Sequence, residues 1–109
     1  MRIAIVGSRS LTVSDIGKYI SSADEIVSGG AVGVDRCAAK YAIENGIKLT
    51  EILPQYKRYG RAAAILRNKE IVDYSDKIIA FWNGSSKGTL SVIKYAQKTG
   101  KPCEIIVCK

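Results

Sequence analysis

The feature that most constrains the fold of this chain is a regular alternation of short apolar runs with longer amphipathic segments. The apolar runs, which predict β-strands, are residues 2–6, 25–28, 48–53, 77–82 and 102–108. The intervening segments carry apolar residues at helical spacing, after Thr12 and within residues 34–45, 60–74 and 90–98. Strands that alternate with helices predict a parallel sheet with helices on both faces. We therefore expect an α/β fold, a Rossmann-like doubly wound domain with a five-stranded, mainly parallel sheet.

Signals at the segment ends support these boundaries. Thr12 and Asp15 have the spacing of a capping box, which predicts the start of the first helix. Gly46 and Gly100 follow the second and fourth helical segments, as residues that end helices do. The strand segments are continuously apolar, which is typical of strands that are buried on both faces.

The composition excludes several kinds of site. The chain has no histidine, so it cannot build a serine–histidine–acid triad or a histidine-ligated metal site. Cys37, Cys103 and Cys108 form no CxxC pair, so we expect neither a metal site nor a disulfide framework. The first apolar run is too short for a signal peptide, and no run approaches the roughly 20 residues that cross a bilayer. We expect a cytoplasmic protein without metal, cofactor or membrane association. Since no linker interrupts the chain, residues 1–109 are predicted to form one domain.

The charge of the chain predicts an anionic partner. Seventeen lysines and arginines against ten acidic residues give a net charge of +7. Such an excess attracts nucleic acid, nucleotide phosphates or acidic membranes. The alternative is a basic surface that only keeps the protein soluble.

Two glycine-rich loops that follow predicted strands are the first candidates for that partner's site. In a parallel sheet the ligand binds beyond the carboxyl ends of the strands, where the strand order reverses. Glycine lets the backbone approach a ligand, and the amino terminus of a helix attracts anions. The predicted phosphate-binding residues of the strand-end loops are Gly7, Ser8, Arg9, Gly29, Gly30, Ala31, Gly33, Asp35, Gly84, Ser85, Ser86, Lys87, Gly88 and Thr89. The alternative for each loop is a tight strand-to-helix turn that needs glycine only for packing.

The standard nucleotide motifs are absent from these loops. The loop after the first strand, GSRSLT, lacks the GxGxxG pattern of dinucleotide-binding domains. Lys87 precedes Gly88, whereas the P-loop has its lysine after the glycine. The expected phosphate site is therefore of another kind.

A predicted polar loop over residues 55–59 combines aromatic and basic residues. Tyr56 and Tyr59 flank Lys57 and Arg58. Aromatic rings among cations can stack on a base while the cations hold its phosphate. Equally, the tyrosines can serve only to attach the loop to the body of the protein.

Four ordered blocks of sequence resemble the SLOG superfamily. The blocks are IVGSR at residues 5–9, SGGAVGVD at 28–35, LRNKEIVDYSDKIIAFW at 66–82 and GSSKGT at 84–89. This superfamily joins the lonely-guy (LOG) phosphoribohydrolases to the DNA-processing protein A proteins, and the small YspA-like branch resembles the chain most. The resemblance implies a Rossmann-like fold with a nucleotide pocket that includes Arg67 and Asn68. For the DNA-processing protein A side, it implies binding of single-stranded nucleic acid through residues 28–35, Arg67 and Asn68.

The resemblance to the LOG enzymes is incomplete where their catalysis takes place. Arg67 is similar to the arginine of their RKxxM stretch, which makes it the candidate catalytic residue here. The position of the LOG glutamate falls on Val92, however, and valine cannot stabilise the positive charge that develops on the sugar. Asp35 and Glu70 are the acids that could replace that glutamate.

Three hypotheses about function follow, in order of preference. The first is a small module that binds a nucleotide or nucleotide-derived molecule, as a sensor or carrier. The second is binding of single-stranded nucleic acid, and the third is hydrolysis of a nucleoside monophosphate. Related folds pair through helices, so we also expect a homodimer, for which the alanine-rich residues 61–66 could serve as the interface or could instead belong to the core.

Overall fold

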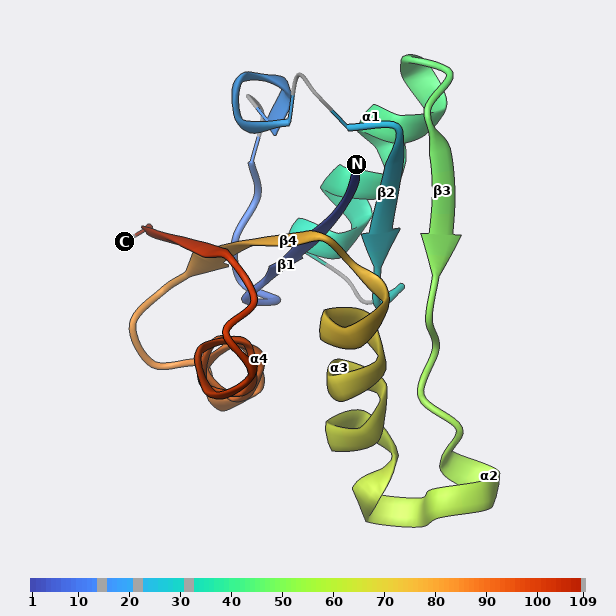
Figure 1. Cartoon of the computed structure of the whole chain (residues 1–109), viewed down its shortest axis with the longest axis vertical. Coiled ribbons are helices and arrows are strands. Elements are labelled where there is room, and N and C mark those ends of the chain that lie inside the picture. Colours follow the sequence, from blue (N-terminus) through green and yellow to red (C-terminus); the bar gives the residue numbers. More distant parts are fainter. Residues whose placement is uncertain (14–15, 21–22, 31–32, 109) are drawn as a thin grey trace.

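The computed structural model describes residues 1–13, 16–20, 23–30 and 33–108, and it contains one five-stranded sheet. The strand order is β3-β2-β1-β4-β5, and every pairing of neighbouring strands is parallel (Figure 1). The strands are β1 (Arg2–Gly7), β2 (Glu25–Ser28), β3 (Lys48–Glu51), β4 (Lys77–Trp82) and β5 (Cys103–Val107). The predicted Rossmann-like α/β fold is therefore confirmed.

The strand order reverses between β1 and β4. The chain builds outward from β1 through β2 to β3, and then returns to place β4 on the other side of β1. The register pairs Gly7 at the end of β1 with Phe81 near the end of β4. The carboxyl ends of these two strands are therefore where a doubly wound sheet is expected to bind its ligand.

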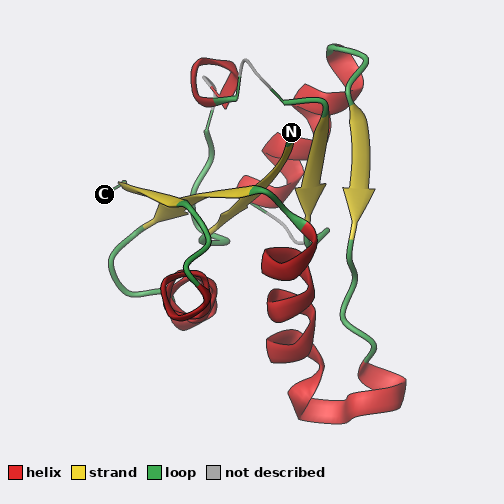
Figure 2. Cartoon of the chain, viewed as in Figure 1, coloured by secondary structure: helices red, strands yellow, loops and turns green. Residues whose placement is uncertain are grey.

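Helices cover both faces of the sheet (Figure 2). On one face, α1 (Val34–Glu44) and the 3-10 turn η1 (Ile16–Tyr19) pack on one set of alternating strand residues, among them Ile3 and Ile5. On the other face, α3 (Ala63–Tyr74) and α4 (Lys87–Thr99) pack on the intervening set, among them Ala4 and Val6. The alternation of side chains along a strand therefore divides the apolar core into two layers.

The edge strands are more exposed than their apolar sequences predict. Glu51 of β3 and Glu104, Ile105 and Val107 of β5 are exposed, whereas β2 and the middle of β1 and β4 are buried. The prediction of strands buried on both faces therefore holds for the three central strands. At the edges each strand has a neighbour on one side only, and the helices cover it incompletely.

The first predicted helix is wrong in extent. Between Thr12 and the start of β2, the described residues contain only the short turn η1. Its sequence includes Gly17, and glycine is a poor helix former. A Cβ atom at Gly17 would lie 2.9 Å from the ring of Tyr41 on α1. The glycine thus allows close packing at the expense of helix length. Asp15, the second residue of the predicted capping box, lies outside the described residues.

The predicted loop over residues 55–59 is mostly helical. Tyr56–Tyr59 forms the short helix α2, the 3-10 turn Gly60–Ala62 follows, and α3 begins at Ala63 rather than at Gly60. Gly60 has a φ angle of +56°, which an α-helix does not allow, so it separates α2 from the next segment. Helix α4 begins at Lys87, three residues before the predicted position, because Ser86 caps it.

None of the helices in the described part of the chain has the length and apolar character needed to cross a membrane.

Candidate functional site

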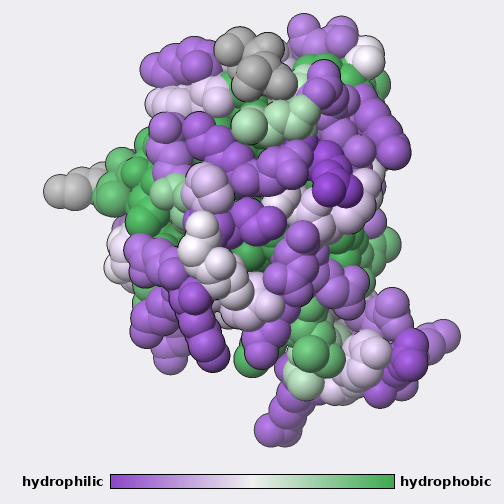
Figure 3. All heavy atoms as spheres, in the orientation of Figure 1, coloured by the Kyte–Doolittle hydropathy of each residue, from purple (hydrophilic) through white to green (hydrophobic). Residues whose placement is uncertain are grey.

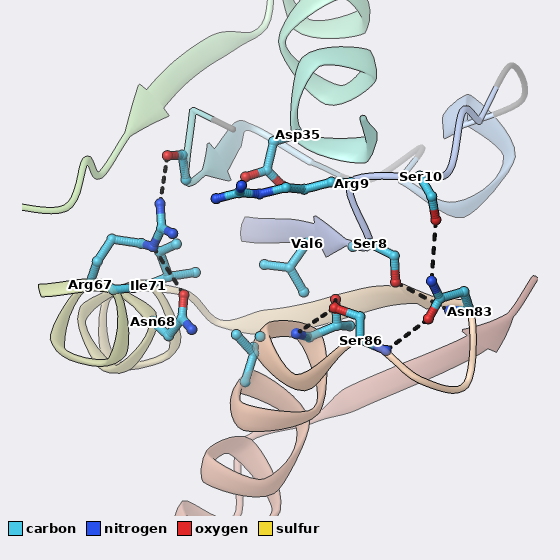
Figure 4. A pocket seen from close by; sticks show the side chains of 16 residues that line it. Val6, Ser8, Arg9, Ser10, Asp35, Arg67, Asn68, Ile71, Asn83 and Ser86 are labelled. Atoms are coloured by element: carbon cyan, nitrogen blue, oxygen red, sulfur yellow. Dashed lines mark hydrogen bonds between the residues drawn. The ribbon is translucent and has the colours of Figure 1, made fainter. Parts of the chain in front are cut away.

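A cavity of about 460 Å³ opens where the strand order reverses, beyond the carboxyl ends of β1 and β4 (Figure 4). Its walls come from the end of β1, from the loops after β1, β2 and β4, and from helices α1, α3 and α4. The predicted site residues that line it are Gly7, Ser8, Arg9, Gly29, Asp35, Arg67, Asn68, Ser86, Gly88 and Thr89. Both glycine-rich loops therefore contribute to one cavity, although β2 and β4 are not neighbours and the loop after β1 lies between them.

Other predicted site residues do not belong to the cavity lining, namely Gly30, Gly33, Gly84, Ser85 and Lys87. A Cβ atom at Gly30 would lie 2.4 Å from Cδ2 of Leu53, on the side of β3. A Cβ atom at Gly33 would lie 2.5 Å from the carbonyl oxygen of Arg9. These two glycines therefore serve close packing around the loop after β2. Ala31 lies outside the described residues.

Six lining residues were not among the predicted site residues: Val6, Ser10, Ala64, Ile71, Asn83 and Val92. Val6, Ile71 and Val92 are buried, and of the three the resemblance to the LOG enzymes singled out Val92 alone. Asn83 immediately follows β4, and its position at the carboxyl end of a strand was the signal that could have identified it as a lining residue. The floor of the cavity is thus an open end of the apolar core.

Hydrogen bonds join the loops after β1 and β4 into one rim. The amide of Ser8 donates to the carbonyl oxygen of Phe81 at 3.1 Å, and the amide of Asn83 donates to Oγ of Ser8 at 3.2 Å. Nδ2 of Asn83 donates to Oγ of Ser10 at 3.2 Å. Asn83 therefore fixes the position of both loops relative to the cavity.

The same asparagine organises the start of α4. Its Oδ1 accepts hydrogen bonds from the amides of Ser85 and Ser86, both at 2.9 Å. Oγ of Ser86 accepts from the amide of Thr89 at 3.4 Å. The amides of Lys87 and Gly88, at the first two positions of α4, come too early for an intrahelical acceptor. Of these two residues Gly88 lines the cavity, so the partly positive end of the helix adjoins the cavity there.

Arg67 reaches from α3 to the loop after β2, as Figure 4 shows. Its Nη1 donates to the carbonyl oxygen of Gly29 at 2.7 Å, and its Nε donates to Oδ1 of Asn68 at 3.0 Å. A Cβ atom at Gly29 would lie 2.6 Å from Nη1 of Arg67 and 3.0 Å from Oδ2 of Asp35. Glycine at position 29 is therefore what lets the guanidinium lie in the cavity wall.

Three cations at the amino edge of the sheet have acidic partners. At the amino edge, the terminal amine of Met1 pairs with Asp24, Nε of Arg2 lies 3.9 Å from Asp76, and Nζ of Lys48 lies 3.5 Å from Glu25. Within the described residues, no ion pair involves the carboxyl-edge cations Arg9, Lys57, Arg58, Arg61, Arg67 and Lys87. Asp35 is the acid that lines the cavity beside these cations, and Figure 4 shows its carboxylate next to the side chain of Arg9.

The groups that glycosidic hydrolysis would need are only partly present. Val92, at the position of the LOG glutamate, is 2% exposed and lines the cavity, so an apolar side chain occupies that wall. Of the two possible replacements, Asp35 lines the cavity, whereas Glu70 is exposed and does not belong to the lining. In the part of the chain that the structure describes, no group of three acidic or cysteine side chains is placed to hold a metal ion.

Solved structures share this fold, among them two of DNA processing protein A, whereas no family model and no curated protein matches the sequence. DNA processing protein A from Streptococcus pneumoniae aligns with 99% of this chain at 22% identity and a TM-score of 0.74. DNA processing protein A from Helicobacter pylori, solved to describe its single-stranded DNA binding mode, aligns with 100% of the chain at 22% identity and a TM-score of 0.75. The chain spans 50% and 66% of the lengths of those proteins. The protein therefore has a Rossmann-like fold of the type seen in DNA processing protein A.

Proposed function

We propose that this chain binds single-stranded nucleic acid, with phosphates of the strand held in the cavity at the carboxyl ends of β1 and β4. The observation that carries the proposal is the set of donors around this cavity. Arg9, Arg67 and the first amides of α4 surround it, and no described ion pair neutralises either arginine. Contacts to phosphate supply most of the sequence-independent affinity of proteins for nucleic acids.

The shape of the site favours a flexible single strand over a duplex. The lining combines polar donors with the apolar side chains of Val6, Ile71 and Val92. An unpaired nucleotide can present a phosphate to the donors and turn its base toward the apolar floor, which a paired base cannot do. The structural likeness to a protein described as binding single-stranded DNA supports the same conclusion.

A nucleotide-derived small molecule is the second candidate, with the protein acting as a sensor or carrier. A volume of about 460 Å³ lies within the range of about 300–1,000 Å³ that is usual for small-molecule sites. Such a ligand would use the same donors but would leave the cations outside the cavity unused.

The test of the proposal is a binding titration with a fluorescently labelled single-stranded oligonucleotide, read as anisotropy. We expect binding at low salt that a duplex of the same length competes for only weakly. Arg67→Ala should weaken the affinity about tenfold or more, as for other hydrogen bonds to charged groups. Lys40→Gln, which removes an equal charge from α1, should leave the affinity nearly unchanged.

The outcome also separates the two candidates. If a mononucleotide displaces the labelled strand at concentrations near its own Kd, and the affinity depends only weakly on salt, then the small-molecule function is the right one. If no single strand binds even at low salt, the proposed function is wrong.

A further inference from the structure

A basic arm projects from the carboxyl edge of the sheet. It adjoins the side of the cavity that holds Arg67, opposite the side formed by the start of α4. We define the arm as residues 53–65. They contain most of the loop that joins β3 to α2, helix α2 itself, the turn Gly60–Ala62 and the start of α3. Figure 1 shows α2 lying beyond the ends of β2 and β3, at the opposite end of the molecule from η1. Figure 3 shows hydrophilic side chains projecting at that end.

The arm belongs to a long stretch without acidic residues. Residues 52–69 contain Lys57, Arg58, Arg61, Arg67 and Lys69 and no aspartate or glutamate. A solvated surface usually mixes both signs of charge, and the arm does not. Its field therefore favours a polyanion over a protein surface of mixed charge.

Large apolar and aromatic side chains are exposed among these cations. Leu53 is 59% exposed, Tyr56 57%, Tyr59 39% and Ile65 53%. Cζ of Arg58 lies 5.2 Å from the centroid of the Tyr59 ring, so a cation and an aromatic ring already share one surface. Exposed rings beside cations are the usual composition of sites that stack bases and hold their phosphates.

The arm continues directly into the cavity wall. Helix α3 begins at Ala63, and Ala64, Arg67 and Asn68 of this helix line the cavity. With a rise of about 1.5 Å per helical residue, Arg67 lies only about 6 Å along the axis from the first residue of α3. A strand with one phosphate near Arg67 can therefore pass along α3 to the tyrosines without leaving the protein surface.

We propose that the arm is a base-stacking extension of the cavity, in which Tyr56 and Tyr59 stack on bases of a single strand while Lys57, Arg58 and Arg61 contact its phosphates. This inference rests on the proposed function, because the cavity must hold the same strand. Stacking accepts every base, so the arm would extend the bound length without adding sequence preference. Its cations oppose the use of the same surface between two copies of the chain, since two arms would place like charges together.

The arm is tested by comparing two double variants, Tyr56→Ala/Tyr59→Ala and Tyr56→Phe/Tyr59→Phe, in the anisotropy titration. Loss of each ring that stacks on a base should weaken binding about fivefold to 100-fold. The phenylalanine variant should stay within about twofold of the unmodified protein, because it keeps the ring faces. Ile43→Ala, a change at another exposed apolar side chain on α1, is the control for loss of apolar surface.

A second comparison asks whether the tyrosines contact bases or only the backbone. An oligonucleotide of abasic residues should bind the unmodified protein more weakly than oligo-dT of equal length. The alanine double variant should distinguish the two strands less than the unmodified protein does, because only the contact of a base with the cavity floor remains. Equal binding by the unmodified protein would overturn the stacking role.

The remaining outcomes distinguish failure of the arm from failure of the function. If Arg67→Ala weakens binding but the alanine double variant does not, the arm proposal is wrong and the proposed function stands. If no strand binds the unmodified protein, both fail. If the alanine double variant converts a dimer to a monomer on a sizing column with unchanged DNA affinity, the arm is an interface between two copies, which overturns the proposal.

Discussion

Gly29 and Gly7 both lie at strand ends beside the cavity, but the atoms that a side chain would meet differ. At Gly29 the nearest atom to a new Cβ is Nη1 of Arg67, the movable end of a long side chain. At Gly7 a new Cβ would lie 2.6 Å from Cβ of Val34 and 2.8 Å from the carbonyl oxygen of Phe81. The first clash can be relieved by moving a guanidinium, whereas the second involves the packing of α1 on the sheet.

We therefore predict that Gly29→Ala mainly affects binding, whereas Gly7→Ala mainly affects stability. Gly29→Ala should displace Arg67, weaken single-strand binding severalfold and change the melting temperature little. Gly7→Ala should destabilise the fold by about 1–3 kcal/mol, the usual cost of overpacking. Thermal melts and binding titrations of both variants test the pair, and a large loss of stability in Gly29→Ala would show that Arg67 cannot move aside.

Glu25 is a second residue whose setting has a measurable consequence. Its Oε2 accepts from Oγ1 of Thr50 at 2.6 Å and from the hydroxyl of Tyr74 at 2.5 Å, while Nζ of Lys48 lies 3.5 Å from Oε1. These hydrogen bonds and the nearby lysine lower the pKa of Glu25 below its ordinary value of 4.5. A carboxyl group with a lowered pKa stabilises the fold above the pKa of the unfolded chain, and that stability is lost as the pH falls.

The prediction concerns the acid side of the stability profile. The melting temperature should fall as the pH drops below about 4.5, and Glu25→Gln should reduce the steepness of that fall while lowering stability at neutral pH. Part of the slope should remain, because the backbone amide of Arg2 lowers the pKa of Asp76 as well. If the melting temperatures of the two proteins fall equally steeply with pH between pH 6 and pH 3, this role of Glu25 is contradicted.

At the scale of elements, the start of α4 depends on residues just before the helix. Ser86 accepts from the amide of Thr89, and its own carbonyl oxygen accepts from Nε1 of Trp82 at 3.0 Å. Asn83 holds the preceding turn. The position of the α4 amino terminus at the cavity is therefore determined by a cap and a turn rather than by the helix alone.

Two substitutions at Ser86 should separate helix stability from binding. Ser86→Ala removes the cap and should cost about 0.5–2 kcal/mol in the free energy of unfolding. Ser86→Asp keeps a capping oxygen and should retain most of that stability, but its carboxylate at the cavity should repel phosphate and weaken binding. Urea denaturation and anisotropy titrations measure the two effects, and Ser91→Ala, within the same helix, is the control. Unchanged binding by Ser86→Asp would mean that no phosphate approaches this end of α4.

At the scale of the whole molecule, the cavity and the arm gather cations without a described ion pair at the carboxyl edge of the sheet, although other such cations, for example Lys77 at the start of β4, lie elsewhere. The ion pairs of Met1, Arg2 and Lys48 lie at the amino edge of the sheet, and the cavity and arm lie at its carboxyl edge. We expect a polyanion to bind along the carboxyl edge, where the cavity and the arm place several of these cations together. The cytoplasmic location, the single domain, the YspA-like branch and the dimer stay predictions.

The salt dependence of binding measures how much of this edge is used. If the six carboxyl-edge cations, namely Arg9, Lys57, Arg58, Arg61, Arg67 and Lys87, all neutralise phosphates, the logarithm of the binding constant should fall with the logarithm of salt at a slope of about −4. Removing the arm charges with Lys57→Gln/Arg58→Gln/Arg61→Gln should reduce the slope to about −2. The control Lys40→Gln/Lys98→Gln should leave it near −4. A slope near −2 in the unmodified protein would confine binding to the cavity.

The order of the elements and the parallel sheet follow from the sequence by itself. So does the expectation that a cavity opens at the carboxyl edge of the sheet. Each depends on local signals: apolar periodicity, glycine at helix ends, and loops that must follow strands. The central strand at residues 77–82 is observed as predicted, because its apolar run is continuous and both of its faces are buried. The resemblance added Arg67 and Asn68, which the periodicity of α3 could not distinguish from surface residues.

Only the tertiary structure decided which residues of the loops face the cavity. Arg67 meets Gly29 across 38 positions of sequence, and Asn83 meets Ser8 across 75. Val92 of α4 lines the cavity together with Val6 of β1 and Ile71 of α3, which are far from it in the sequence. Local patterns determine which elements form. The side chains that meet at a strand end depend on the strand order and on close approaches between distant segments, which no local pattern contains.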